Sequence, residues 1–429
     1  MFLSSSRRRR RRWPLVLAAV LVLGAGGAVA AYFAFFKAPG DVSNPRVEFR
    51  PEEPEPPPPP KRKRRSASFT WPTYGYTPDR SRYLPTKLGP PFKRVWSVRA
   101  RSLLEFQPVL AKGTLYLVKN NGEALALSAK TGRVKWRRKV GTLAASSPAY
   151  SKNRLFITTL SRRVTSLDAR TGRIRWVKNL PSRSESSPLV LRERVYFGSE
   201  DGTVYALRAS NGGQVWRYRA GGAVKAALAY SDGVLYFGDY AGQVTAIRSR
   251  NGSRVWRSGT SGRTLGRAGN FYSTAAVRFG RVYVGNTDGR VYSFAARNGQ
   301  LAWSRSTGAF VYAAPAVARV PGTPPSVYIG SYDGNFYALD ARSGKTRWIH
   351  NAGGRISGAG TVIGRVVYFA NLATKTTIGL DVRSGRRVFR FGHGSFNPVI
   401  SDGRRLYLTG YSLQFAFEPL RKSKRKRRR

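Results

Sequence analysis

The chain has 429 residues, with 76 Lys and Arg against 21 Asp and Glu, a formal net charge of +55 and no cysteine. The lack of cysteine excludes a disulfide framework, a thiolate metal site, a catalytic cysteine and a lipid-modified cysteine near the N-terminus. Residues 67–420 alone hold 54 basic and 16 acidic residues, so the charge implies either acidic partners or an arginine-biased composition.

The N-terminal 36 residues predict a membrane anchor. Residues 1–12 are a basic N-terminus with the unbroken run Arg7 to Arg12, and residues 13–36 carry no charge. As a helix, with a rise of about 1.5 Å per residue, residues 13–36 reach roughly 36 Å, enough to cross a hydrocarbon core of about 30 Å. The arginines should keep the N-terminus inside a bacterial-type cytoplasmic membrane and place the rest of this single-pass chain outside. A cleaved signal peptide, with Ala28-Val29-Ala30 as the cleavage site, is the alternative.

Residues 37–66 predict a linker. They contain nine prolines, including PEEPEPPPPP at 51–60, and then the basic run KRKRR at 61–65. Proline runs of this kind form extended polyproline II spacers. We therefore expect a stalk that lifts the next domain away from the membrane.

A repeat of small–x–x–Gly–x–x–x–aromatic follows, as in ARSGKTRW ending at Trp348. The aromatic positions, including an upstream copy at Trp96, are spaced by 40 residues four times and then by 47, 45 and 41 residues. A period near 40 is typical of four-stranded propeller blades. The aromatic set comprises Trp96, Trp136, Trp176, Trp216, Trp256, Trp303, Trp348 and Phe389.

Each period also contains three other strand-like segments in fixed order, exemplified by APAV, VYIG and FYAL, and Asp-Gly or Asn-Gly turns favour tight hairpins between the second and third. Each class of segment occurs eight times, but one aromatic-bearing strand precedes the first set and the last set lacks one. The sequence thus predicts an all-β fold over residues 67–420, an eight-bladed propeller of four-stranded antiparallel blades closed by the strand around Trp96. Seven blades would leave strands unpaired.

The repeat motif favours packing over ligand binding. The small residue permits close approach, the glycine three positions later turns the chain, and the aromatic can bury between neighbouring blades. Periodic, near-identical residues suit repeated packing better than one asymmetric ligand. We therefore interpret the eight aromatics as structural docking residues.

The motif, with the lead-in WPTYGYTPDRSRY at 71–83, resembles the pyrroloquinoline-quinone-type propeller repeat of quinoprotein alcohol dehydrogenases and of the propeller lipoproteins of outer-membrane assembly. The resemblance covers about residues 69–418 and implies the fold more than the function, since one fold hosts many functions. The dehydrogenases commonly use an adjacent cysteine pair beside the quinone, which this chain lacks, and a calcium ion held by oxygen ligands.

Acidic residues fall mostly in turns or at strand ends, so we expect no catalytic residue, cofactor or metal. Asp239 and Asn286, which follow the segments YFG and YVG, are the candidates for a central polar site. The two histidines, His350 and His393, are far apart, and no Walker loop, serine-hydrolase elbow or HExxH motif is present.

Two insertions lengthen the fifth and sixth intervals, at 258–277 and 317–327. Long loops on a rigid scaffold often carry binding specificity, so Arg267, Phe271 and Tyr272 are candidate partner contacts. The basic body and the basic tail 421–429 would suit nucleic acid by charge alone, but an extracytoplasmic location favours anionic lipid or wall polymer.

The sequence therefore predicts a membrane-anchored, extracytoplasmic propeller that serves as a non-catalytic scaffold for an envelope protein. One alternative is a dehydrogenase that uses pyrroloquinoline quinone and calcium in an atypical site. The other is a binder of carbohydrate or anionic wall polymer.

Overall fold

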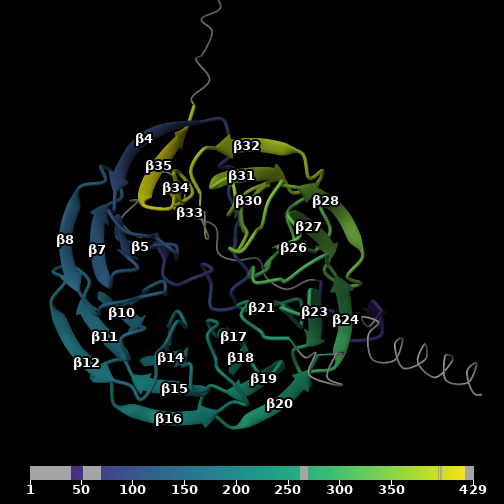
Figure 1. Cartoon of the computed structure of the whole chain (residues 1–429), viewed down its shortest axis with the longest axis horizontal. Coiled ribbons are helices and arrows are strands. Elements are labelled where there is room, and N and C mark those ends of the chain that lie inside the picture. The colour runs from purple at the N-terminus through teal and green to yellow at the C-terminus, as the bar shows by residue number, and fades with distance from the viewer. Residues whose placement is uncertain (1–39, 52–68, 261–268, 395, 397–398, 421–429) are drawn as a thin grey trace, which may run out of the picture.

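The computed structural model describes residues 40–51, 69–260, 269–394, 396 and 399–420, and these form a ring of eight antiparallel sheets around a central channel (Figure 1). The prediction of eight four-stranded blades is confirmed, and the seven-bladed alternative is wrong. No helix forms among the described residues, and none there could span a bilayer. The predicted basic N-terminus, the span 13–36, Arg267 and the tail 421–429 lie outside them.

Each blade runs from an inner strand at the channel to an outer strand at the rim. The first four blades are β5–β8, β9–β12, β13–β16 and β17–β20. Their strands are β5 (Val109–Ala111), β6 (Thr114–Val118), β7 (Glu123–Ser128), β8 (Val134–Lys139), β9 (Ala149–Ser151), β10 (Arg154–Thr159), β11 (Arg163–Asp168), β12 (Ile174–Asn179), β13 (Leu189–Leu191), β14 (Arg194–Gly198), β15 (Thr203–Arg208), β16 (Gln214–Arg219), β17 (Ala229–Ser231), β18 (Val234–Gly238), β19 (Gln243–Arg248) and β20 (Arg254–Gly259).

Blades five to seven follow the same pattern, and blade eight joins the two ends of the propeller. Their strands are β21 (Ala276–Arg278), β22 (Arg281–Gly285), β23 (Arg290–Ala295), β24 (Leu301–Ser306), β25 (Ala316–Ala318), β26 (Ser326–Gly330), β27 (Asn335–Asp340), β28 (Thr346–Asn351), β29 (Thr361–Ile363), β30 (Val366–Asn371), β31 (Thr376–Asp381), β32 (Arg387–Phe391), β33 (Val399–Ser401), β34 (Leu406–Thr409), β35 (Leu413–Pro419) and β4 (Phe92–Arg99). The outer strand β4 pairs with β35 in antiparallel register, with Trp96 opposite Ala416, so the strand around Trp96 closes the ring as predicted.

The burial of each strand follows its place in the blade. In β22 every residue is buried, because the neighbouring blades cover both faces of a second strand. The outer strand β12 instead alternates between exposed and half-buried positions. This difference explains why second and third strands are continuous apolar runs while outer strands are rich in Arg and Lys.

The repeated tryptophans dock on the next blade. Trp303 is fully buried, and its indole Nε1–H donates to the Ala341 carbonyl at 3.0 Å. A Cβ on Gly344, whose φ is +72°, would lie 2.7 Å from the Trp303 ring, so only glycine admits the indole here. The same bond joins Trp96 to Ala129, Trp136 to Ala169, Trp176 to Ala209, Trp216 to Ser249, Trp256 to Ala296 and Trp348 to Val382.

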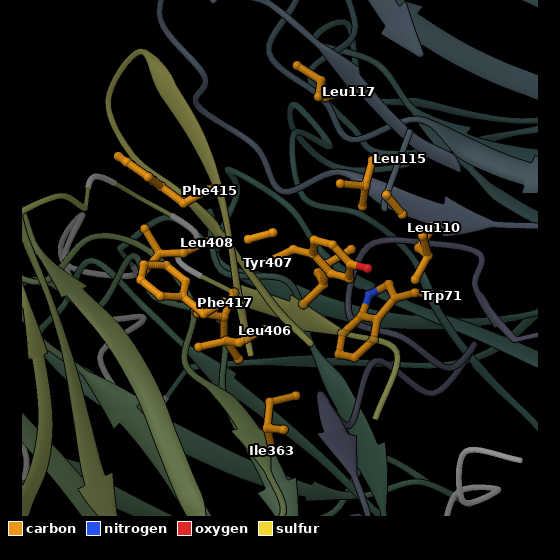
Figure 2. Packing of buried hydrophobic residues seen from close by; sticks show 14 of the residues in the cluster. Trp71, Leu110, Leu115, Leu117, Ile363, Leu406, Tyr407, Leu408, Phe415 and Phe417 are labelled. Carbon is orange, nitrogen blue, oxygen red and sulfur yellow. The ribbon is translucent and has the colours of Figure 1, made fainter. Parts of the chain in front are cut away.

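Phe389 packs differently because blade eight has no small–x–x–Gly turn to receive it. Its ring lies edge-on to Phe92 of β4 at 5.8 Å and to Phe417 of β35 at 6.3 Å between centroids. Phe389 thus contacts both strands that close the ring. These residues adjoin the core cluster of the closure, which includes Trp71, Leu110 and Tyr407 (Figure 2).

Residues 69–90, the central segment, run through the channel (Figure 1) and contact all eight blades in turn. Two short strands belong to it, β2 (Thr70–Trp71) beside β5 and β3 (Tyr83–Leu84) parallel to β29. Its other bonds include Tyr150 N–H to Pro72 O, Thr73 Oγ1–H to Pro188 O, Tyr230 N–H to Pro78 O, Val277 N–H to Asp79 O, Val317 N–H to Ser81 O and Thr86 Oγ1–H to Gly403 O. The channel is therefore not an open pore.

Residues 40–51 lie along blade five, where β1 (Val42–Ser43) adds a fifth strand at the outer edge, with Ser43 opposite Trp303. Asp41 pairs with Arg290 at 3.0 Å and with Arg305 at 2.6 Å, and Val47 is buried. This part of the predicted linker is thus packed on the propeller instead of forming a free spacer, because it offers an acidic and an apolar residue to a basic, apolar edge.

Candidate functional site

Eight loops carry the chain from an outer strand to the next inner strand, and they converge at one end of the channel. The residue four positions before each inner strand differs in type from blade to blade, although the residues around it are mostly small. We name this set the loop column. It comprises Glu105, Ala145, Glu185, Lys225, Tyr272, Tyr312 and Ser357, and its eighth member, Ser395, lies outside the described residues.

A cavity of about 70 Å³ lies at this end of the channel. Six of the seven described members of the loop column line it, all except Ala145, and Tyr74 of the central segment lines it as well. The short residues that follow, such as Ala227 and Thr274, complete its wall. We call this feature the central cavity.

Charged groups gather on one side of the central cavity. The Lys225 ammonium lies 2.8 Å from Glu185 and 3.4 Å from Glu200, and the Tyr272 hydroxyl donates to Glu185 at 3.0 Å. Burial lowers the pKa of Lys225, but Glu185, Tyr240 and Glu200 together raise it above its ordinary value. The ammonium therefore stays charged and forms ion pairs with both carboxylates.

Glu105 lies across from this cluster in the cavity wall. Burial raises the pKa of its carboxyl, and the negative charge of Glu185 adds to the rise. Burial raises the pKa of the Tyr272 hydroxyl well above its ordinary value, and the charges of Glu185 and Glu105 add to this rise. Tyr272 therefore acts as a hydrogen-bond donor and not as a base.

Aromatic side chains adjoin the charged cluster and extend over blades four to six. The ring pairs are Tyr240–Tyr272 at 6.5 Å, Tyr272–Tyr312 at 5.7 Å, Phe310–Tyr312 at 5.9 Å and Tyr312–Tyr332 at 4.8 Å between centroids. We call these five residues the aromatic rim. Phe310 is 51% exposed, so the rim presents apolar surface to solvent.

The predicted partner contacts separate in the structure. Tyr272 lines the central cavity and belongs to the aromatic rim. Phe271, the preceding residue, is fully buried in the core between blades four and five, so it cannot contact a partner in this fold. The two differ because neighbouring residues in extended chain point to opposite sides. Arg267 lies outside the described residues.

Asp239 and Asn286 do not form a central polar site. Both are buried at the equivalent turn between the second and third strands, and neither lines the central cavity. The Asp239 carboxylate accepts backbone N–H groups of Gly221, Ala241 and Gln243, while Asn286 Oδ1 accepts from Asp288 N–H. Burial raises the pKa of Asp239, and these bonds oppose the rise. Their role here is to hold turns and loops together.

The central cavity does not fit pyrroloquinoline quinone with calcium. Its volume of about 70 Å³ is far below the roughly 300–1,000 Å³ of typical ligand pockets. Calcium takes about 6–8 oxygen ligands, whereas Glu185 and Glu200 are already bridged by Lys225. No group of three His, Cys, Asp or Glu suited to a metal occurs in the part of the chain that the structure describes. His350 lies on the outer strand β28, and the His393 ring packs 5.0 Å from Phe415.

Sequence reasoning missed Glu105, Glu185, Lys225 and Tyr312. A signal was present, because these residues occupy the one position before the inner strand where the repeat changes from glutamate to lysine to tyrosine. A repeat keeps residues that pack and is free to vary those that face the channel end. The loop column, together with the inserted loops, therefore indicates the candidate site.

Comparison with known proteins gives two kinds of match. The family model of the outer membrane protein assembly factor BamB matches residues 93–147, 140–256 and 192–391. The structure of BamB from Moraxella catarrhalis superposes with a TM-score of 0.64 and 18% identity over 76% of this chain and 100% of that chain.

Dehydrogenases share the fold as well. The quinohemoprotein alcohol dehydrogenase ADHIIG from Pseudomonas putida HK5 gives a TM-score of 0.69 at 14% identity over 82% of this chain and 81% of its own. A europium-containing methanol dehydrogenase gives 0.69 at 14% identity, over 81% of this chain and 98% of its own. A search of curated proteins finds no match. At such low identity the structural likeness concerns the fold alone.

Proposed function

The chain belongs to the family of the outer membrane protein assembly factor BamB, and we propose that it is a non-catalytic, protein-binding scaffold for assembly in the cell envelope. The observation that carries this proposal is the aromatic rim beside a cavity too small for a typical cofactor. Exposed aromatic side chains held by their neighbours are typical of the centres of protein interfaces.

The partner would bind over the face that holds the central cavity. Phe310 is 51% exposed there, and Leu143 and Tyr411, in loops and turns of the same face, are 48% and 47% exposed. Tyr312 contacts three other members of the rim, which fixes its ring without burying it fully. A rigid aromatic surface of this kind gains contact area at low entropic cost when a partner docks.

The location within the proposal rests on the sequence. Residues 13–36 would anchor the protein in the cytoplasmic membrane, with the propeller outside, and the basic tail 421–429 would lie near anionic lipid or wall polymer. Nucleic acid is not an expected partner in that location. The basic surface would then add attraction to the envelope without selecting the partner.

The test is in-cell crosslinking followed by purification of the anchored protein and mass spectrometry of what comes with it. Phe310→Ser should reduce the yield of a dominant envelope protein at least several-fold. Ile349→Ser is the matched control, because Ile349 is 53% exposed but lies on the outer strand of blade six, the blade into which the Phe310 loop leads. Equal yields from both variants, or recovery of lipid and wall polymer alone, would contradict the proposal.

The alternative is a quinone-dependent dehydrogenase, because dehydrogenases of this type share the fold. It would require stoichiometric, calcium-dependent binding of pyrroloquinoline quinone and dye-linked oxidation of an alcohol or sugar. We expect neither, because the Lys225 ammonium stands where a metal ion would need the Glu185 and Glu200 carboxylates. Saturable quinone binding that Lys225→Met strengthens would favour the enzyme.

A further inference from the structure

Two arginines of the central segment are fully buried inside the channel. Arg80 and Arg82 both have 0% exposure, although arginine is almost never fully buried without a partner. Both have a backbone φ in the left-handed region, at +60° and +57°. Such a backbone is costly for a residue with a Cβ, so their places are imposed by the surrounding contacts.

Arg80 is only partly satisfied by the protein. Its Nε–H donates to the Leu228 carbonyl at 2.8 Å, and its Nη1 donates to Thr73 Oγ1 at 2.6 Å and to the Tyr74 carbonyl. Its Nη2 is buried and has no hydrogen-bond partner in the described part of the chain. Burial and, after it, the nearby charge of Arg82 lower the pKa of Arg80 to about 9.

Arg82 is less satisfied still. Its guanidinium lies over the Tyr74 ring, 3.9 Å from the centroid. Nε, Nη1 and Nη2 are all buried without a hydrogen-bond partner among the described residues. The Thr361 hydroxyl is also buried without a hydrogen-bond partner among the described residues. Thr361 lies near Arg82 in the fold, because the N–H of the next residue, Val362, donates to the Arg82 carbonyl.

No carboxylate forms an ion pair with Arg80 or Arg82 in the part of the chain that the structure describes. The nearest acidic residue in sequence, Asp79, is paired with Arg278 at 3.5 Å, and its charge offsets only part of the effect of burial on Arg80. The cation–π contact with the Tyr74 ring offsets a small part of the cost of burying the Arg82 guanidinium. Buried charges in proteins are normally paired, since removing an ion from water costs several kcal/mol.

We propose that the channel holds a small inorganic anion, a halide or an oxyanion of phosphate size, bound by Arg82 and by the Nη2 of Arg80. The anion would accept hydrogen bonds from unpartnered guanidinium nitrogens of both arginines and reduce the repulsion between their two like charges. Neither arginine lines the central cavity, so the anion would be separate from that cavity and independent of the proposed function. It would also hold the central segment in place, because both arginines belong to that segment.

The test compares wild type, Arg82→Met and Arg133→Met. Arg133 is exposed on a turn, so its variant makes the same change in net charge without touching the channel. Each protein is exchanged into acetate buffer and denatured, and the released chloride and phosphate are measured by ion chromatography. We expect a stoichiometric amount of one of them from wild type and Arg133→Met and its loss from Arg82→Met. Either ion supports the site and identifies its source.

A second measurement needs no variant. Wild-type crystals grown with bromide, or with phosphate if phosphate is the ion released, should show density between Arg80 and Arg82, as an anomalous peak for bromide. Release of the same amount by all three proteins would mean an adventitious ion only. That result, or ordered water alone on the guanidinium nitrogens, would overturn the proposal.

Discussion

Trp303→Ala should destabilise the propeller more than the same change at any half-buried docking tryptophan. Trp303 is fully buried because Ser43 of β1 pairs with it and Val47 packs in the same core cluster. Its indole donates to the Ala341 carbonyl at 3.0 Å. Trp136 makes the equivalent bond to Ala169, also at 3.0 Å, but no strand covers it.

The magnitude follows from burial. Removing a fully buried tryptophan costs about 3–5 kcal/mol, because the lost apolar contact and the remaining cavity add together. For Trp136 we expect about 2 kcal/mol, since part of its indole is already in water. The hydrogen bond is common to both sites, so the difference between the two losses in free energy of unfolding measures how much residues 40–51 contribute by covering Trp303.

Chemical unfolding of both variants, with the midpoint and slope of each transition compared with wild type, measures these losses. Trp303→Ala should lower the midpoint about twice as far as Trp136→Ala. Equal losses would refute the reasoning that residues 40–51 complete the docking site. A loss below about 1 kcal/mol at Trp303 would refute the docking role itself.

Three further outcomes follow from individual contacts. Gly344→Ala should lower the melting temperature more than Gly113→Ala, because both glycines have positive φ but an added Cβ would clash with the docked indole only at Gly344. Equal decreases in melting temperature would contradict this. Burial raises the pKa of Asp288 to about 6, so the native state favours the protonated carboxyl, and the stability that this group contributes is lost as pH rises from about 4 through 6. The melting temperature of Asp288→Asn should therefore exceed that of wild type at pH 8 and match it below pH 4, and the reverse order would be contrary evidence. Lys225→Met should cost about 2 kcal/mol by leaving the Glu185 carboxylate without its cation, and adding Glu185→Gln should recover part of that loss in the double variant; no recovery would count against the ion pair.

The fold was predictable from sequence because its packing is periodic. The spacing of Trp96 to Phe389 fixed the number of blades, and the missing aromatic in the last set indicated the closure between β4 and β35. The docking of each tryptophan on the following blade was not predictable in detail, because the motif gives the partners but not which blade receives them.

The site was predicted less well, for two physical reasons. Asp239 and Asn286 follow strands as a ligand set would, but their oxygens accept backbone N–H groups in turns. The central cavity is lined by single residues from separate loops. These residues are about 40 positions apart in the chain, so their proximity produces no local sequence motif. The filling of the channel by the central segment likewise depends on contacts with all eight blades.

The central claim is that a protein partner binds the face bearing the aromatic rim. A photo-crosslinking amino acid placed at Phe310, and separately at Ile349 on β28, tests it most directly in living cells. The account predicts one dominant crosslinked envelope protein from position 310 and little or none from position 349. Crosslinks from position 349 alone, or from neither position while the protein is abundant, would contradict it.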